Sequence, residues 1–355
     1  MLKDVTSGVT RLLAGRRRKR VNLALQGGGA HGAFTWGVLD HLLDDGRIEI
    51  AGISGTSAGA VNAVMLADGL ARGGKQVARE RLAAFWRAAS LGGHLPGAQR
   101  AVVDRLLSLF PFNASPMQMV VDAMARYLSP YDVNPLNINP LKGLIERFAD
   151  FETIRNAAGP DLFICATNVH SGRLRVFTRG EITGDVVMAS AALPLLFRAV
   201  EIEGEPYWDG GFTGNPAIIP LIEANDVDDV LVVQISPLAR ESTPTSVRDI
   251  LHRMNEITFN ASLDSELRAL EFIGRSARGR GKAHGGAAPR IKVHRIVMEG
   301  VGRKLGAGSR LNTDYDFFAL LHRAGKRAAR RFLEQHYRDI GRRSTMDLTE
   351  VAASA

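Results

Sequence analysis

Short apolar runs alternate with glycine turns and amphipathic segments at the start of the chain. The run VNLALQ (21–26) is apolar and leads into glycines, which predicts a buried strand. Apolar residues then recur at helical spacing over 34–43, and a second apolar run, IEIAGIS (48–54), precedes another helical pattern. Strand, glycine turn and helix thus occur twice, which predicts parallel strands joined by helical crossovers.

The pattern changes over residues 90–140, where prolines interrupt short apolar helices. Such a segment inside a compact domain is typical of a cap, lid or binding loop. Its most apolar stretches, 101–110 and 117–128, would form either an acyl-binding cap or a plain cover for the core. Farther on, the pattern predicts strands at 162–168, 174–178, 230–236 and 291–297, a helix at 250–273 and a basic loop at 277–290.

The net charge of +8 is concentrated in three segments, 1–20, 275–292 and 322–343, each of which carries +6. The rest of the chain is acidic, so the charge pattern does not fit a nucleic-acid-binding domain. The basic segments would allow a peripheral contact with an anionic membrane surface. A solvated tail explains residues 1–20 equally well, and a solvated arginine-rich face is the preferred interpretation of residues 322–343. In residues 1–20 the apolar positions precede the basic run, unlike in a secretory signal, which predicts a cytoplasmic protein.

The segment GTSAG (55–59) lies between a predicted strand and a predicted helix. In this context the G-x-S-x-G pattern places a nucleophilic serine, Ser57, on a sharp turn, and Gly55 and Gly59 remove side chains that would collide there. The helix that follows directs the positive end of its dipole at the serine, which favours developing negative charge. The sequence therefore predicts a nucleophile at Ser57.

A nucleophilic serine needs a base, and none of the nine histidines sits in a local pattern that marks a catalytic one. Asp209 instead ends a short apolar segment at a glycine turn formed by Gly210 and Gly211. A carboxyl group has a reference pKa near ~3.9, so it would act as a base at neutral pH only against apolar neighbours and in contact with the serine. Asp209 is therefore the candidate base.

The loop LQGGGAHGAF (25–34) allows two interpretations. Gly27, Gly29 and Gly32 fit the spacing of a dinucleotide-binding loop, but glycine amides at the same place could hold an oxyanion during ester hydrolysis. A dinucleotide site needs an acidic residue at the end of the second strand, and Glu49 lies before that end. The G-x-S-x-G motif at 55–59, one strand and one helix later in the chain, favours the interpretation that the glycine amides hold an oxyanion.

Together these motifs resemble the patatin-like phospholipase family. The resemblance covers roughly residues 21–223 and rests on the order of four motifs: the glycine loop at 27–32, GTSAG at 55–59, the Ala-Ser-x-x-x-Pro block at 189–194 and DGG at 209–211. It implies Ser57 as the nucleophile, Asp209 as its partner in a two-residue dyad, and the backbone N–H groups of Gly27, Gly28 and Gly29 as the oxyanion hole. The implied substrates are lipid acyl esters, as for a phospholipase A or a lysophospholipase.

The resemblance also implies a three-layer α/β fold with a central, mostly parallel sheet flanked by helices. We expect no metal or cofactor, because an acyl-enzyme mechanism requires neither and the acids and histidines show no ligand spacing. His31 departs from the family, in which many members carry Arg or Lys at this position, and we expect a packing role for it. The expected organisation is a basic amphipathic tail (1–20), a catalytic domain (21–224) with a cap-like insertion (90–140), a C-terminal α/β extension packed on the core (225–345) and a tail (346–355).

Three alternatives stay open at this point. The first is a carboxylesterase with a Ser-His-Asp triad, in which His252 or His294 acts between Ser57 and Asp209. The second is a dinucleotide-binding domain built on Gly27, Gly29 and Gly32. The third is a non-catalytic lipid or protein scaffold.

Overall fold

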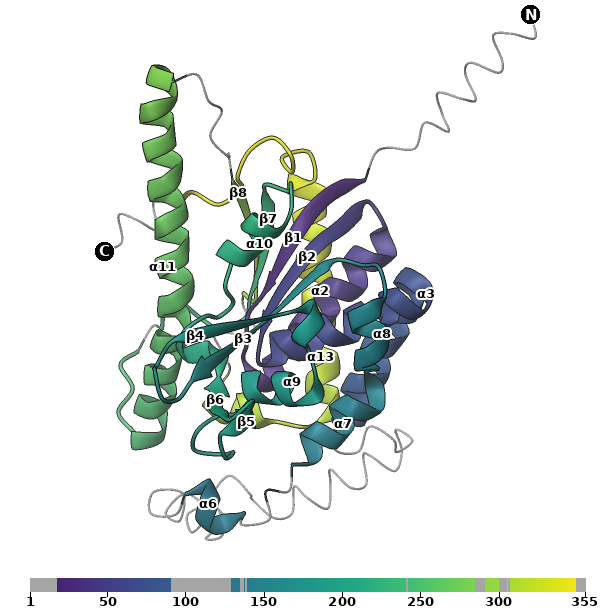
Figure 1. Cartoon of the computed structure of the whole chain (residues 1–355), viewed down its shortest axis with the longest axis vertical. Coiled ribbons are helices and arrows are strands. Elements are labelled where there is room, and N and C mark those ends of the chain that lie inside the picture. Colours follow the sequence, from purple (N-terminus) through teal and green to yellow (C-terminus); the bar gives the residue numbers. More distant parts are fainter. Residues whose placement is uncertain are drawn as a thin grey trace, which may run out of the picture.

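The protein is described from a computed structural model, shown in Figure 1. Most of the predicted N-terminal tail, cap and C-terminal tail lies outside the described residues. The structure describes residues 18–90, 129–134, 137, 139–240, 242–284, 291–299, 305 and 307–348.

A single mixed sheet runs through the described part of the chain, with the strand order β5-β6-β3-β2-β1-β7-β8 and β4 beside β3. The strands β1, β2, β3, β7 and β8 are parallel, whereas β4, β5 and β6 are antiparallel to their neighbours. The mostly parallel sheet that the sequence predicts is thereby confirmed. The strands span Lys19–Leu25 (β1), Ile48–Thr56 (β2), Asp161–Asn168 (β3), Leu174–Thr178 (β4), Val200–Ile202 (β5), Glu205–Asp209 (β6), Asp229–Gln234 (β7) and Lys292–Val297 (β8).

Helices cover both faces of the sheet (Figure 1). The helices α2, α3 and α13 pack together on one face, while α10 and α11 lie on the other, which gives the three layers. The helices span Gly32–Asp45 (α2), Ala58–Ala88 (α3), Pro130–Val133 (α6), Pro140–Phe148 (α7), Phe151–Asn156 (α8), Gly184–Ser190 (α9), Ile219–Ala224 (α10), Val247–His284 (α11) and Tyr315–His336 (α13); short 3₁₀ turns span Gly29–His31 (η1), Arg179–Glu181 (η3), Gly210–Phe212 (η4) and Ala307–Leu311 (η5).

The central strand β1 contributes to a hydrophobic core on each face of the sheet. Leu23 and Leu25 join the core under α2, α3 and α13, whereas Ala24 joins the smaller core under α10 and α11. Because successive side chains of a strand point to opposite faces, a strand covered on both sides is apolar at most positions. This explains the largely apolar run that marks β1 in the sequence; its one buried polar residue, Asn22, donates hydrogen bonds to the carbonyls of Leu221 and Val227.

Residues beyond 225 extend the same sheet. Strand β7 pairs with β1 and β8 pairs with β7, while α13 packs on α2. The predicted loop at 277–290 is wrong over 277–284, because α11 continues to His284; residues 285–290 lie outside the described chain. No helix among the described residues is long and apolar enough to cross a membrane.

Candidate active site

Ser57 occupies the turn between β2 and α3, at the carboxyl end of a central strand. Its backbone has φ 56° and ψ −121°, a conformation that a residue with a Cβ adopts only when the surroundings impose it. A Cβ at Gly59 would overlap the backbone of Leu25, and one at Gly55 would lie 2.6 Å from the Gly59 carbonyl oxygen. The two glycines therefore allow the close approach that the turn requires.

The Ala-Ser-x-x-x-Pro block (189–194) holds both candidate catalytic residues by hydrogen bonds. The backbone N–H of Ser57 donates to Ser190 Oγ at 2.9 Å, and the N–H of Asp209 donates to the Ala192 carbonyl oxygen at 2.9 Å. Ser190 and Ala192 are both fully buried. The block thus fixes the positions of Ser57 and Asp209 relative to each other.

Asp209 ends β6 and is fully buried. Its Oδ1 accepts a hydrogen bond of 2.7 Å from the N–H of Gly211, whereas its Oδ2 has no partner of full hydrogen-bond geometry among the described residues. Burial raises the pKa of Asp209 to about 7, against the smaller opposing effects of the Gly211 amide and the Ser57 hydroxyl. The carboxylate and the serine hydroxyl are therefore neighbours, with one carboxylate oxygen left without a strong donor.

The glycine loop lies directly against Ser57. A Cβ at Gly27 would be 2.8 Å from the Ser57 Cβ, and one at Gly28 would be 3.0 Å from the Ile235 side chain. The Gly27 N–H donates to Asn215 Oδ1 at 2.7 Å, so this amide already has an acceptor. The amides of Gly28 and Gly29 have none within the described chain and are the better candidates for an oxyanion.

The remaining motif glycines also mark close contacts. A Cβ at Gly32 would be 2.7 Å from the Ala58 Cβ, and one at Gly210 would overlap the carbonyl of Cys165. A Cβ at Gly211 would be 2.7 Å from the ring of Phe259 in α11. Gly32 therefore allows the glycine loop to pack on the serine turn, whereas Gly210 and Gly211 allow the Asp209 turn to pack on β3 and α11.

Three polar residues that the motifs do not single out tie the glycine loop to its surroundings. Asn215 accepts from Gly27 and donates to the Phe259 carbonyl oxygen at 3.1 Å. Gln26 accepts from the backbone of Ile235 at 2.9 Å and donates to Asn260 Oδ1 at 3.0 Å. Such side chains carry no local sequence signal, because their partners lie between 44 and 234 residues away along the chain.

The histidines proposed for a triad have other partners. His294 faces Asp229 Oδ1 at 3.0 Å and Thr345 Oγ1 at 3.2 Å with its two ring nitrogens. His252 lies 3.4 Å from Glu256 through Nδ1. Neither has a contact with Asp209 or Ser57 among the interactions of the described chain.

His31 is buried beside the glycine loop and lies 2.9 Å from Ser309 Oγ through Nε2. Burial, together with the nearby charge of Arg310, lowers the pKa of His31 to about 3, so the imidazole is neutral at physiological pH. It therefore adds no positive charge to the loop.

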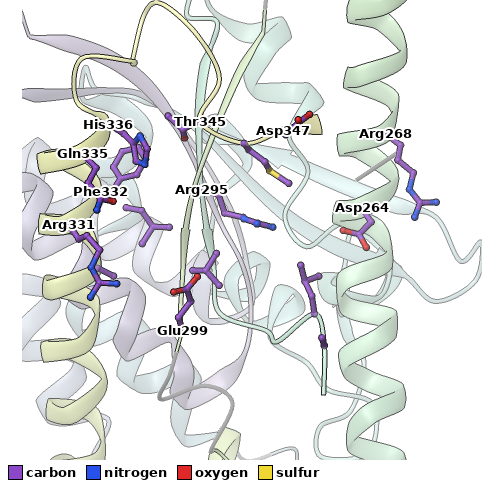
Figure 2. A pocket seen from close by; sticks show the side chains of 16 residues that line it. Asp264, Arg268, Arg295, Glu299, Arg331, Phe332, Gln335, His336, Thr345 and Asp347 are labelled. Carbon is purple, nitrogen blue, oxygen red and sulfur yellow. The ribbon is translucent and has the colours of Figure 1, made fainter. Parts of the chain in front are cut away.

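A large open cavity of about 880 Å³ lies elsewhere, between α11, β8 and α13 (Figure 2). Arginines and acids line it together, including Arg268, Arg295 and Arg331 with Asp264 and Glu299, and none of the candidate catalytic residues is among them. A mixed-charge lining does not suit an acyl chain, which prefers apolar walls. We therefore keep the candidate active site at Ser57. No group of three or more metal-ligating side chains occurs in the described parts of the chain.

Sequence comparison identifies the class of protein. The family model of patatin-like phospholipases matches residues 23–222, more than half of the 355 residues, and the match includes Ser57 and Asp209. The chain belongs to the patatin-like phospholipase family. It is therefore an enzyme of the lipid acyl hydrolase class, and its substrates are lipids.

The solved structures similar to this chain include proteins from two bacteria. VipD from Legionella pneumophila is 15% identical, with 90% of this chain and 67% of VipD covered at a TM-score of 0.41. Full-length ExoU, in its complex with SpcU from the type III secretion system of Pseudomonas aeruginosa, is 17% identical. The match covers 95% of this chain and 76% of ExoU at a TM-score of 0.29. A second structure of the ExoU–SpcU complex is 16% identical, and the match covers 95% of this chain and 74% of the matched chain at the same TM-score. No curated protein sequence matches the chain. The assignment rests on the family match.

Proposed function

We propose that this enzyme hydrolyses the acyl esters of phospholipids or lysophospholipids through a dyad of Ser57 and Asp209. One observation carries the proposal: a fully buried carboxylate adjoins a serine in a strained strand-to-helix turn, and burial brings the pKa of Asp209 to about 7. A general base works best when its pKa lies near the working pH. Asp209 meets this condition without help from a histidine.

In the proposed reaction, Ser57 Oγ attacks the ester carbonyl carbon while Asp209 accepts the hydroxyl proton. The carbonyl oxygen becomes negatively charged and accepts hydrogen bonds from the amides of Gly28 and Gly29. The tetrahedral intermediate collapses, the alcohol leaves with the proton from Asp209, and an acyl-enzyme remains. A water molecule then attacks the acyl carbon while Asp209 takes its proton, and Asp209 returns this proton to Ser57 Oγ as the bond to the serine breaks and the fatty acid is released.

The alternatives are less well supported by the geometry. A Ser-His-Asp triad needs a histidine between Ser57 and Asp209, but His252 and His294 bind other carboxylates. A dinucleotide site needs an open glycine loop, whereas this loop packs on Ser57 and donates one amide to Asn215. We retain the proposed catalytic domain at 21–224 and the extension at 225–345. The peripheral contact with an anionic membrane stays a prediction, since residues 1–17 are not described.

Labelling with a fluorophosphonate tests the nucleophile. The wild-type protein should be labelled and should release fatty acid from a panel of phospholipids and lysophospholipids, and Ser57→Ala should lose both properties. Ser54→Ala is a matched control, because Ser54 is a buried serine on β2, the strand that leads into the Ser57 turn. Labelling that persists in Ser57→Ala, or a folded wild-type protein with neither labelling nor esterase activity, would contradict the proposal.

A further inference from the structure

Arg310 reaches the glycine loop from the far end of the chain. Its carbonyl oxygen occupies the space that a Cβ at Gly29 would need, and the adjacent residue, Ser309, faces His31. Gly29 has φ +59°, a conformation that favours glycine in any case. The turn η5 is therefore packed against the proposed oxyanion loop.

The side chain of Arg310 extends from η5 toward Ser236 and Phe259. Its Nη2 donates to Ser236 Oγ at 3.0 Å, just after β7, and its guanidinium carbon is 5.8 Å from the ring centroid of Phe259. The same phenyl ring contacts Gly211, whose amide binds Asp209. The cation is thus held beside both halves of the proposed site.

The charge of Arg310 is not neutralised by a hydrogen-bonded carboxylate among the described residues. Its Nε is buried without a hydrogen-bond partner, and the nearby acid, Glu256, is already bound by Arg240 at 2.5 Å and Arg253 at 3.2 Å. The charge still reaches the reacting groups, because Arg310 lowers the pKa of Asp209. A guanidinium stays protonated even when it is partly buried. The site therefore contains an available fixed cation.

We propose that the Arg310 guanidinium binds the phosphate of a glycerophospholipid whose acyl ester is positioned at Ser57. The inference rests on the proposed function. In such a lipid the phosphodiester is joined to the same glycerol as the scissile esters, so a group beside Ser57 can reach it. The planar donor fork of an arginine matches phosphate oxygens and forms strong charge-assisted hydrogen bonds. Arg310 then makes the enzyme prefer esters that carry a phosphate.

The experiment compares Arg310→Gln with the wild-type enzyme on two lipids of equal acyl chains in the same detergent micelles. Phosphatidylcholine carries the phosphate, and diacylglycerol offers the same ester without it. The loss of the charge changes the pKa of Asp209 for both lipids alike. We therefore expect kcat/KM to fall at least about 10-fold more on phosphatidylcholine than on diacylglycerol, as for a lost charge-assisted hydrogen bond. Arg310→Lys should recover part of the loss, because an ammonium keeps the charge but not the fork.

Arg295→Gln, in the cavity of Figure 2, is the matched control, because it removes one arginine from another part of the chain. Equal losses of Arg310→Gln on the two lipids, no loss on either, or an equally selective loss in Arg295→Gln would overturn the inference. Stimulation of diacylglycerol hydrolysis by inorganic phosphate would also overturn it, because Arg310 would then bind a free phosphate ion and not the phosphate of the lipid substrate. Failure of the proposed function is distinguishable, because the wild-type enzyme would then hydrolyse neither lipid and Ser57 would not be labelled.

Discussion

Two buried carboxylates in this protein have opposite electrostatic surroundings. Asp209, at the end of β6, is fully buried and accepts one backbone amide. Asp40, on α2, is 8% exposed and contacts Arg79 at 2.6 Å, Lys326 at 2.8 Å and His322 at 3.0 Å. Burial raises the pKa of Asp209 to about 7, whereas hydrogen bonds from His322, Lys326 and Arg79 outweigh burial and hold the pKa of Asp40 well below its usual range.

The difference shows that burial alone does not decide the charge of a carboxyl group. Cationic donors stabilise the ionised form of Asp40, and this cluster also joins α2 to α3 and α13. Asp209 lacks such donors in direct contact, so its ionised form keeps a strong affinity for a proton. Asp40, a structural acid, and Asp209, the candidate base, therefore differ more in their hydrogen-bond partners than in how deeply they are buried.

The strongest test of this contrast is the same substitution at both positions. Asp209→Asn keeps the shape of the side chain but removes its ability to accept a proton, so we expect kcat/KM to fall by about 10²- to 10⁴-fold, the usual contribution of a general base. Asp40→Asn should change kcat/KM by less than about 3-fold, because no interaction links Asp40 to Ser57. Initial rates of fatty-acid release would measure both. Activity of Asp209→Asn near that of the wild-type enzyme would exclude the dyad.

The pH dependence of stability should also separate the two acids. Because the pKa of Asp209 is higher in the folded state than in the unfolded chain, the folded state binds its proton more tightly, and this stabilisation is lost as the pH rises from about 4 through about 7. The wild-type protein should thus lose up to about 4 kcal/mol relative to Asp209→Asn between pH 4 and pH 8. Urea unfolding at several pH values measures this difference.

Asp40→Asn should shift stability in the opposite sense. A depressed pKa contributes stability that is present above the unfolded pKa and is lost as the pH falls through the folded one. The variant should therefore be less stable than the wild-type protein at pH 8, by about 1–3 kcal/mol for the lost charged hydrogen bonds, and the gap should narrow in acid. If the stability of both variants relative to the wild-type protein changed in the same direction with pH, the two carboxylates would not differ in this way.

Much of the fold could be predicted from local pattern. The predicted strands at 162–168 and 174–178 lie within one residue of β3 and β4, because buried strands flanked by turns carry a strong apolar signal. The predicted turn at 55–59 is strained at Ser57, as the glycine spacing requires. The sequence pattern predicts a helix that ends at 273, because the glycines at 279 and 281 are typical of a loop, whereas α11 continues to His284.

The polar environment of the candidate site could not be predicted in the same way. The positions of Ser57 and Asp209 follow from short motifs, but Asn215 and Arg310 meet the glycine loop only in the folded chain. The raised pKa of Asp209 results from burial with few hydrogen-bond donors nearby. Tertiary packing determines which donors lie near the carboxylate, so a local sequence pattern cannot predict it. Motifs therefore identified candidate reacting groups, while the tuning of those groups required the structure.

A smaller effect should come from the side chain that joins the glycine loop to α11. Asn215 binds the Gly27 amide and the Phe259 carbonyl, and Asn215→Ala leaves both without a partner in a buried region. We expect a loss of about 1–3 kcal/mol in the free energy of unfolding and, because the glycine loop loosens, about a 10-fold fall in kcat/KM. Asn225→Ala is the matched control, since Asn225 bonds to Asn22 and Asp161 at the opposite end of the strands. Asn225→Ala should destabilise the fold to a similar extent and leave kcat/KM within about 2-fold of the wild-type value. Equal losses of activity in the two variants would show that the Asn215 contact affects activity only through the stability of the fold.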